Sequence, residues 1–123
     1  YTNEIIEKFN VKTTGVSALA SSLSGGNLQK FVVGREIGQK PSLFIVNQPT
    51  WGVDALSAAN IRQAIVDIAN TGAAIILISQ DLDEILEISN KVAFLTNGNL
   101  SIPTNTVNIK TDEIGAIMGG ISD

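Results

Sequence analysis

Residues 43–54 read LFIVNQPTWGVD, and this stretch decides the fold. Leu43 to Val46 is a continuous apolar run bounded by a proline on either side. A short apolar run between such breakers is typical of a strand buried on both faces of a parallel sheet. Asn47 and Gln48 follow directly, at the carboxyl end of the strand, where open α/β sheets place their ligands.

Helices and apolar strands alternate on both sides of this stretch. Upstream, helical periodicity predicts helices over Thr2 to Phe9 and over Leu28 to Ile37, the second with Leu28, Phe31, Val32 and Arg35 at helical spacing. Downstream, the pattern predicts a helix, a buried strand, a short helix and a third strand, over Asp54 to Asn70, Ala73 to Ile78, Leu82 to Ser89 and Val92 to Leu95. This βαβαβ order favours an α/β fold with a parallel sheet and flanking helices.

The stretch after the third strand carries signals for a hairpin and a last helix. Asn97-Gly98 is typical of a hairpin turn, and it returns the chain through Leu100 to Ile102. Thr111 and two acidic neighbours then open a helix that Gly119 and Gly120 close.

Composition excludes several classes of function. The chain has 123 residues, of which 44% are hydrophobic, so it forms one compact domain or part of one. Its net charge of -4 offers no basic footprint for nucleic acid. The absence of His and Cys excludes disulfides, thiolate nucleophiles and His-based catalysis or metal binding. The apolar runs are far below the ~18 residues that span a bilayer, so we expect a soluble chain.

Two glycines and a serine stand at the entrance of the predicted helix over Leu28 to Ile37. Ser24-Gly25-Gly26-Asn27 presents bare N–H groups and a hydroxyl, which suits an anion, and the helix dipole adds roughly 0.3 to 1 kcal/mol for negative charge. Taken alone, the loop is better explained as an ordinary Gly-rich turn that caps a helix, because such turns are far more common than anion sites.

Amides stand where a nucleotide hydrolase needs acids. After such a strand, one acid usually holds Mg²⁺ and the next positions water for attack on the γ-phosphate. Asn47 and Gln48 keep the shape of acids but offer neither negative charge nor a proton acceptor. Gln80 ends the neighbouring strand and therefore lies at the same sheet edge. It can donate to a phosphate oxygen but cannot shuttle a proton. Taken alone, each of these two loops is better explained as a polar turn with no functional role.

Together, the three loops resemble the ATP-binding cassette (ABC) ATPases. Leu23 to Lys30, LSGGNLQK, is similar to the family's signature motif, in the LSGGN form of tandem ATPases of monosaccharide and nucleoside importers. Leu43 to Asp54 resembles the Walker B strand followed by the D-loop, and Ile76 to Ile85, ILISQDLDEI, resembles the H-loop segment. The resemblance covers nearly the whole chain and implies a P-loop NTPase-like parallel sheet with flanking helices.

The resemblance also implies roles for individual residues. The signature residues would complete the ATP site of a partner cassette, and they are Leu23, Ser24, Gly25, Gly26 and Asn27. The D-loop would consist of Gly52, Val53 and Asp54. Asn47 takes the place of the Mg²⁺-binding Asp, Gln48 that of the catalytic Glu and Gln80 that of the switch His. We therefore expect a degenerate site with no catalytic residue and no metal ligand of its own, and no ATPase activity from the isolated chain.

We expect an incomplete cassette. The Walker A loop and the Q-loop, which the family places before the signature, are absent, and Tyr1 begins a helix without a capping residue, so the N-terminal half of the cassette would be missing. Residues 1–22 would be the end of the helical subdomain and a linker to the signature. Residues 23–123 would be the C-terminal part of the ATPase core, with a terminal hairpin and helix.

The function implied by the resemblance is that of the ATP-binding subunit of an importer for simple sugars or nucleosides, at the cytoplasmic face of the bacterial membrane. ATP and Mg²⁺ would be cofactors of the complete transporter. Its partners would be a second cassette or the N-terminal ATPase domain of the same polypeptide, transmembrane permease subunits and, indirectly, an extracytoplasmic solute-binding protein. Two alternatives are a regulatory or structural cassette that does not drive transport, and an unrelated α/β domain with coincidental Gly turns.

Overall fold

The computed structural model describes residues 1–110 and 112–116. The chain divides into two units, Tyr1–Gln80 and Asp81–Asp123, and each is considered by itself. Over the described ranges, the strands form three two-stranded sheets, and the predicted α/β class is confirmed. Within those same ranges, no helix combines the length and the apolar character needed to cross a membrane.

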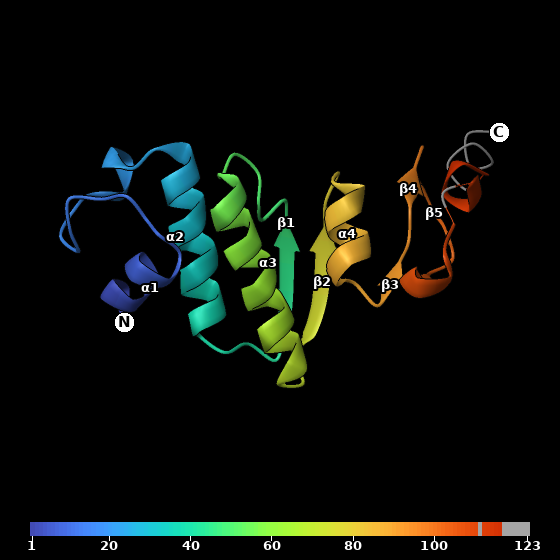
Figure 1. Ribbon diagram of the computed structural model, residues 1–123, viewed down its shortest axis with the longest axis horizontal. Helices are drawn as coiled ribbons and strands as arrows, with labels where there is room; N and C mark the ends of the chain where they lie inside the picture. The colour runs from blue at the N-terminus through green and yellow to red at the C-terminus, as the bar shows by residue number, and fades with distance from the viewer. Residues whose placement is uncertain (111, 117–123) are drawn as a thin grey trace. The chain divides into compact units, whose positions relative to one another are not determined.

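The first unit alternates helices with two parallel strands (Figure 1). Its elements in chain order are α1 (Thr2–Lys8), the short 3₁₀ helix η1 (Ala20–Ser22), α2 (Gly25–Gly38), β1 (Leu43–Asn47), α3 (Ala55–Asn70) and β2 (Ala74–Ile78). The register places Leu43 opposite Ala74 and Asn47 opposite Ile78. Both strands therefore end at the same edge of the sheet, as predicted.

Helix α3 supplies most of the apolar core beside the sheet. Its predicted stripe is confirmed, because Ile61, Ile65 and Ile68 are 0%, 3% and 8% exposed. The helix packs against both β2 and α2. Gly72, just beyond its C-terminal end, has φ of +103°, a conformation that glycine adopts without strain.

Helix α2 packs against α1 through a face that contains a glycine. An added Cβ at Gly34 would lie 2.6 Å from Phe9 Cδ2 and 2.8 Å from Ile5 Cγ2, so the two helices approach closely there. The helical spacing predicted from Leu28, Phe31 and Val32 does not mark the buried face, because Leu28 and Val32 are 37% and 36% exposed. That part of the prediction was wrong. The buried residues of α2 are instead Lys30, Val33, Gly34 and Ile37.

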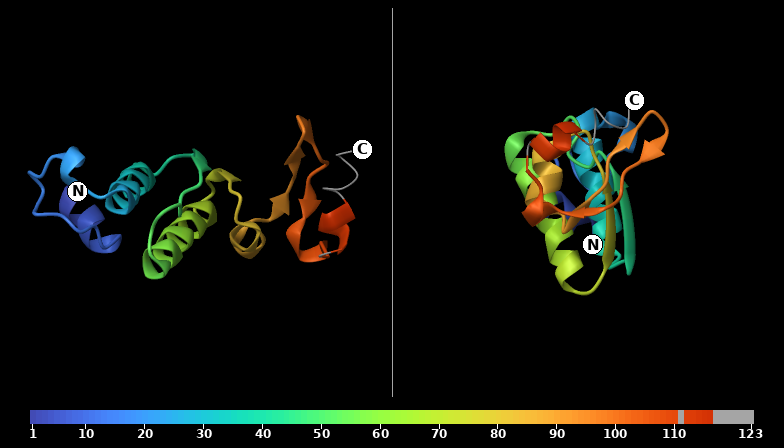
Figure 2. Two further views of the ribbon diagram at one scale, coloured as in Figure 1. Left: turned by 90° about the horizontal axis from the view of Figure 1, so that it is seen from above. Right: turned by 90° about the vertical axis from the view of Figure 1, so that its right-hand side faces the viewer.

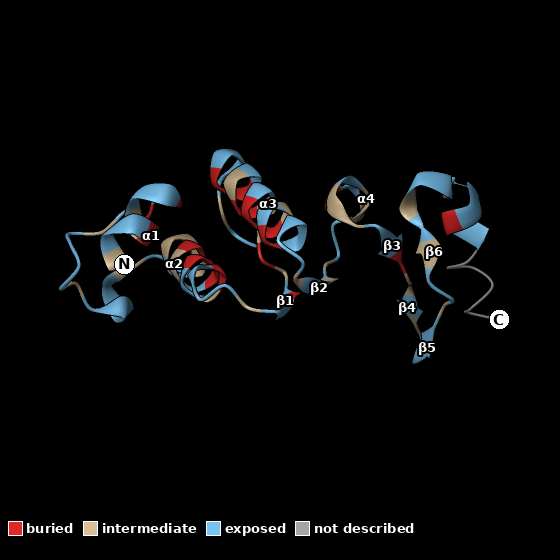
Figure 3. Ribbon diagram, turned by 90° about the horizontal axis from the view of Figure 1, so that it is seen from below, coloured by how far each residue is buried: buried red, intermediate tan, exposed pale blue. Residues whose placement is uncertain are grey.

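The sheet has one covered face and one exposed face. Along β1, Phe44 and Val46 are buried, whereas Leu43 and Ile45 are 54% and 60% exposed. Helix α3 lies on one side of the strands (Figure 2), and Figure 3 shows the buried residues as stripes along α2 and α3. The prediction of strands buried on both faces was therefore wrong for the described residues, because helices cover only one side of this sheet.

The second unit consists of short elements. These are α4 (Leu82–Ile88), β3 (Lys91–Val92), β4 (Leu95–Thr96), β5 (Asn99–Leu100), β6 (Thr104–Asn105), the 3₁₀ helix η2 (Thr106–Asn108) and a helical segment over residues 112–116. The predicted hairpin is confirmed: β4 pairs antiparallel with β5, and Asn97 and Gly98 have φ of +51° and +78°. The predicted closing residues of the last helix, Gly119 and Gly120, and its predicted start at Thr111 lie outside the described residues.

The predicted third strand over Val92 to Leu95 does not form as one element of a parallel sheet. Instead, β3 pairs antiparallel with β6, and β4 pairs with β5. The backbone of Phe94, between β3 and β4, bonds across the hairpin to Ser101, whose Oγ accepts from the Phe94 N–H at 2.8 Å. Local antiparallel pairing therefore takes up backbone groups of this segment.

Gly34→Ala tests the contact between α1 and α2. The added methyl group would overlap Phe9 and Ile5, so we expect the free energy of unfolding to fall by about 1–3 kcal/mol, measured by urea denaturation. Gly115→Ala is the matched control, because a Cβ there meets no atom within 4 Å. The free energy of unfolding of this variant should be unchanged or slightly higher. Equal destabilisation of the two variants would contradict the packing.

Candidate functional site

The Ser24-Gly25-Gly26-Asn27 sequence forms the entrance of α2. Ser24 is the N-cap, with extended φ and ψ of −63° and 160°, and its Oγ accepts from the Asn27 N–H at 3.3 Å. Gly25 and Gly26 lie in the first turn of the helix, which begins three residues earlier than predicted. Leu23, at the end of η1, is half-buried. Because the first N–H groups of a helix have no intrahelical partner, this entrance presents donors to a ligand.

The two glycines differ in their surroundings. A Cβ at Gly26 would lie 2.7 Å from the carbonyl oxygen of Gly52 and 3.9 Å from Val53 Cα, so the helix entrance touches the predicted D-loop backbone to backbone. A Cβ at Gly25 would meet no atom within 4 Å. A hollow of about 310 Å³ lies at this junction, lined by Lys12, Ser24, Gly26, Asn27, Lys30, Gly52, Val53 and Asp54. The structure therefore brings the predicted signature and D-loop residues together.

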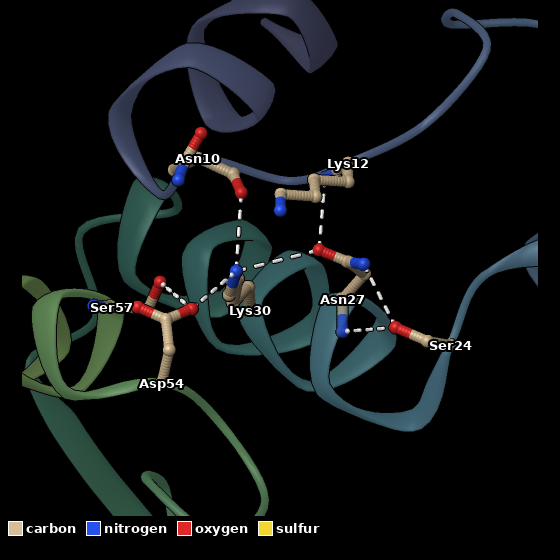
Figure 4. Close-up of polar contacts among 7 residues, drawn as sticks. All are labelled: Asn10, Lys12, Ser24, Asn27, Lys30, Asp54 and Ser57. Atoms are coloured by element: carbon tan, nitrogen blue, oxygen red, sulfur yellow. Dashed lines mark hydrogen bonds and ion pairs between the residues drawn. The ribbon is translucent and has the colours of Figure 1, made fainter.

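A buried cation joins these two segments (Figure 4). Lys30 is 4% exposed, and its Nζ lies 3.0 Å from Asp54 Oδ2. The same nitrogen donates to the Asn10 carbonyl at 3.2 Å and to Asn27 Oδ1 at 3.5 Å. An ammonium group has three protons, and each has an oxygen to bond. The burial of this charge is thereby compensated.

Asp54 caps α3 and pairs with Lys30 at the same time. Its Oδ1 accepts from the Ser57 N–H at 2.9 Å, and its Oδ2 accepts from Ser57 Oγ at 2.8 Å. The Ser57 backbone hydrogen bond, with the Lys30 ammonium second, holds the pKa of Asp54 well below its usual range. Asp54 therefore carries its negative charge throughout the neutral range.

The ends of β1 and β2 form a second polar group. Gln48 has φ of +52°, and its N–H donates to the Ile78 carbonyl at 2.8 Å. Gln48 Oε1 accepts from the Gln80 N–H at 3.4 Å, so the structure brings these two predicted residues together. Asn47, the last residue of β1, is exposed. Within the described ranges, no group of three or more acidic, His or Cys residues forms a possible metal site.

Four residues at this junction were missed by the sequence-based reasoning. Gln29 joins α2 to the strand end, because its Nε2 donates to the carbonyls of Gln48 and Pro49 at 3.1 and 3.0 Å. The others are Lys12, Lys30 and Ser57. The sequence did contain a sign of the role of Lys30, because this residue shares a helical face with Val33, Gly34 and Ile37. A cation on a buried helical face requires a carboxylate partner.

Solved structures of cassette ATPases share this fold. An ATP-binding subunit of an ABC transporter matches 96% of the chain with a TM-score of 0.82 at 18% identity, and the chain covers 52% of it. A dimeric ATP-binding cassette in a post-hydrolysis state, bound to ADP and phosphate, matches 85% of the chain with a TM-score of 0.73 at 18% identity, and the chain covers 45% of it. At these identities the likeness shows the fold alone.

Sequence relatives are more specific. A glucose import ATP-binding protein of Haloferax volcanii is 38% identical over 97% of the chain, which covers 22% of that protein. A nucleoside import ATP-binding protein of Lactococcus lactis is 37% identical over 98% of the chain, which covers 24% of it. A ribose import ATP-binding protein of Shouchella clausii is 40% identical over 79% of the chain, which covers 19% of it. No protein-family model matches the chain.

Fold and sequence lead to one class: the chain belongs to the ABC ATPases. Within that class, its relatives are sugar and nucleoside import ATP-binding proteins, and it corresponds to the C-terminal part of a cassette. The chain spans less than a quarter of the length of the three relatives described.

Gly26→Ala and Gly25→Ala form a matched pair that tests the contact between the helix entrance and the D-loop. Both residues lie in the first turn of α2, but only at Gly26 would the methyl group collide with a backbone carbonyl. We expect Gly26→Ala to cost about 1–3 kcal/mol in the free energy of unfolding, and Gly25→Ala to cost nothing measurable. If chemical denaturation ranks the pair in the opposite order, the D-loop does not lie where it is described.

Acid titration tests the Asp54 contacts. The pKa of Asp54 is lower in the folded state than in the unfolded chain, so its ionised form stabilises the fold. This stabilisation is complete above the ordinary aspartate pKa of about 4 and is lost as pH falls toward the folded-state pKa. Asp54→Asn keeps a capping side chain but cannot neutralise Lys30, so we expect lower stability at pH 7 and a shallower loss below pH ~4. Melting temperatures from pH 7 to 2 measure this. The exposed Asp67→Asn is the charge-matched control, and its curve should follow that of the unmodified protein.

Proposed function

We propose that this chain supplies the signature loop to an ATP site of a partner cassette, in an importer for simple sugars or nucleosides. The observation that carries the proposal is the entrance of α2, where Ser24 and the N–H groups of the first turn surround Gly25, a residue whose missing side chain leaves open space. The names of the relatives support the solute class. Ser24, Gly25 and Gly26 would contact the γ-phosphate of the partner's ATP.

The chemistry of the entrance fits a phosphate group. Free N–H groups and the positive end of the α2 dipole favour a negative charge, by roughly 0.3 to 1 kcal/mol for the dipole alone. Asp54 also lines the hollow, but Lys30 pairs with it at 3.0 Å. Lys12 is a further cation among the lining residues. The carboxylate therefore does not make the hollow repel an anion.

The chain's own strand-end site would not hydrolyse ATP. Asn47 and Gln48 have no charge for Mg²⁺, and Gln48 Oε1 already accepts from the Gln80 N–H. General acid–base catalysis contributes typically 10²- to 10⁴-fold, and an amide cannot supply it. Mg²⁺ and the catalytic acids would therefore belong to the partner's site, and the chain alone would be inactive.

The remaining assignments follow from the same proposal. The partner would be a second cassette or an N-terminal ATPase domain of the same polypeptide, and both would act with transmembrane permease subunits and, indirectly, with an extracytoplasmic solute-binding protein. The assembly would lie at the cytoplasmic face of the membrane. Residues 1–22 would be the end of the helical subdomain with its linker, and residues 23–123 the C-terminal part of the ATPase core.

Gly25→Asp and Asn47→Ala in the complete importer test this division of roles. A carboxylate at Gly25 would repel the partner's γ-phosphate, and the open space around Gly25 lets the chain fold with it. We expect ATP-driven uptake and steady-state ATPase activity to fall by at least tenfold for Gly25→Asp. Asn47→Ala should change them by less than about twofold, because the amide holds no catalytic metal.

The comparison requires equal amounts of folded protein, which thermal melting checks, with Gly25→Ala as a control for loss of the glycine itself. Full uptake by Gly25→Asp would exclude a role of this loop at a phosphate and would favour a regulatory or structural cassette. Loss of activity in Asn47→Ala alone would place the working site in this chain.

A further inference from the structure

A continuous line of polar contacts runs from the D-loop to the capping hydroxyl of α2 (Figure 4). Asp54 Oδ2 pairs with Lys30 Nζ at 3.0 Å, and Lys30 Nζ donates to Asn27 Oδ1 at 3.5 Å. Asn27 Nδ2 then donates to Ser24 Oγ at 2.8 Å. Asn27 thus stands between the buried cation and the serine at the helix entrance.

The chemistry of its neighbours fixes which way the Asn27 amide faces. Oδ1 meets the backbone N–H of Lys12 at 2.9 Å and the ammonium of Lys30, and both of these groups are donors only. An amide turned by 180° would point its NH₂ group at two groups that can only donate, and the Ser24 hydroxyl would then have to donate to Asn27 Oδ1. The orientation with Nδ2 on Ser24 is therefore the one that satisfies all of these groups.

This orientation determines what the Ser24 hydroxyl can do. A hydroxyl has two lone pairs and one proton. Ser24 Oγ accepts two hydrogen bonds, from the Asn27 backbone N–H at 3.3 Å and from Asn27 Nδ2 at 2.8 Å. Because Asn27 occupies both lone pairs, the Ser24 proton is directed toward an acceptor other than Asn27. An oriented donor loses less entropy on meeting an anion than a freely rotating hydroxyl does.

We propose that Asn27 is a positioning residue that holds the Ser24 hydroxyl as a donor to a phosphate oxygen, and that the Lys12 N–H and the Lys30 ammonium, itself paired with Asp54, hold Asn27 in that orientation. This inference rests on the proposed function, because it assigns the acceptor as the γ-phosphate of the partner's ATP. It also makes the D-loop and the signature hydroxyl parts of one polar network, which Lys30 joins by contacting both Asp54 and Asn27.

A double-mutant cycle in the complete importer separates this role from general support of the helix. Single variants Ser24→Ala and Asn27→Ala and the double variant are compared by kcat and KM of ATP hydrolysis. A hydrogen bond to a charged group corresponds to roughly a 10- to 100-fold change, so Ser24→Ala should lower kcat/KM by about that much. Asn27→Ala should lower it by roughly three- to tenfold in the natural background and by less than about twofold in the Ser24→Ala background.

Asn27→Asp distinguishes loss of the donor from loss of the fold. It keeps an oxygen for the Lys12 N–H and for Lys30, so its melting temperature should be preserved, but it offers Ser24 an acceptor in place of Nδ2. In the natural background, Asn27→Asp should lower kcat/KM. In the Ser24→Ala background it should cause no further loss, so the double variant should match Ser24→Ala alone. Asn3→Ala, which removes an exposed amide on α1, is the control and should leave both constants unchanged.

The outcomes are distinguishable. If Ser24→Ala leaves kcat/KM unchanged, the proposed function of the loop fails. If Ser24→Ala lowers it but Asn27→Ala costs the same factor in both backgrounds, the loop does bind phosphate and the positioning role of Asn27 is overturned. A loss in Asn27→Asp that persists in the Ser24→Ala background would likewise overturn it, because the effect would come from charge and not through Ser24.

Discussion

Lys30 keeps a positive charge at a position that is only 4% exposed, and the structure around it is arranged to satisfy that charge. Its three partners come from three separate segments: the turn that follows α1 at Asn10, the first turn of α2 at Asn27 and the N-cap of α3 at Asp54. Lys30 is the buried member of the ion pair, since the Asp54 side chain is 54% exposed, and a buried cation that loses an oxygen partner is left incompletely compensated. The position of each segment therefore depends on the presence of the others.

Local features of this fold were predictable, and the non-local ones were not. The stripe of Ile61, Ile65 and Ile68 and the hairpin turn at Asn97-Gly98 are set by short stretches of sequence, and both were predicted correctly. The exposed face of β1 and the separate pairing of β3 depend on what lies beside them in space, which periodicity does not report. The ion pair of Lys30 with Asp54 joins residues far apart in sequence, and only the unusual position of a cation on a buried helical face indicated it.

The site shows the same division. The meeting of Gln48 with Gln80 follows from parallel strands that end at one edge, so chain order alone predicted it. The contact of Gly26 with the Gly52 carbonyl does not follow from order, because it requires the loop after β1 to turn back onto α2. Gln29 helps to fix that return by donating to the carbonyls of Gln48 and Pro49, and it thereby links α2 to the amide-bearing strand end.

The exposed side of the β1 and β2 sheet has a thermodynamic consequence. Leu43 and Ile45 of β1 and Ile76 and Ile78 of β2 are each at least half exposed, so water covers a contiguous set of aliphatic side chains on adjacent strands. Withdrawing such a surface from water lowers the heat capacity of the system, and near room temperature the gain is almost entirely entropic. Any association through this face would therefore weaken on cooling, whereas the charge-dominated contacts of Lys30 lack this heat-capacity signature.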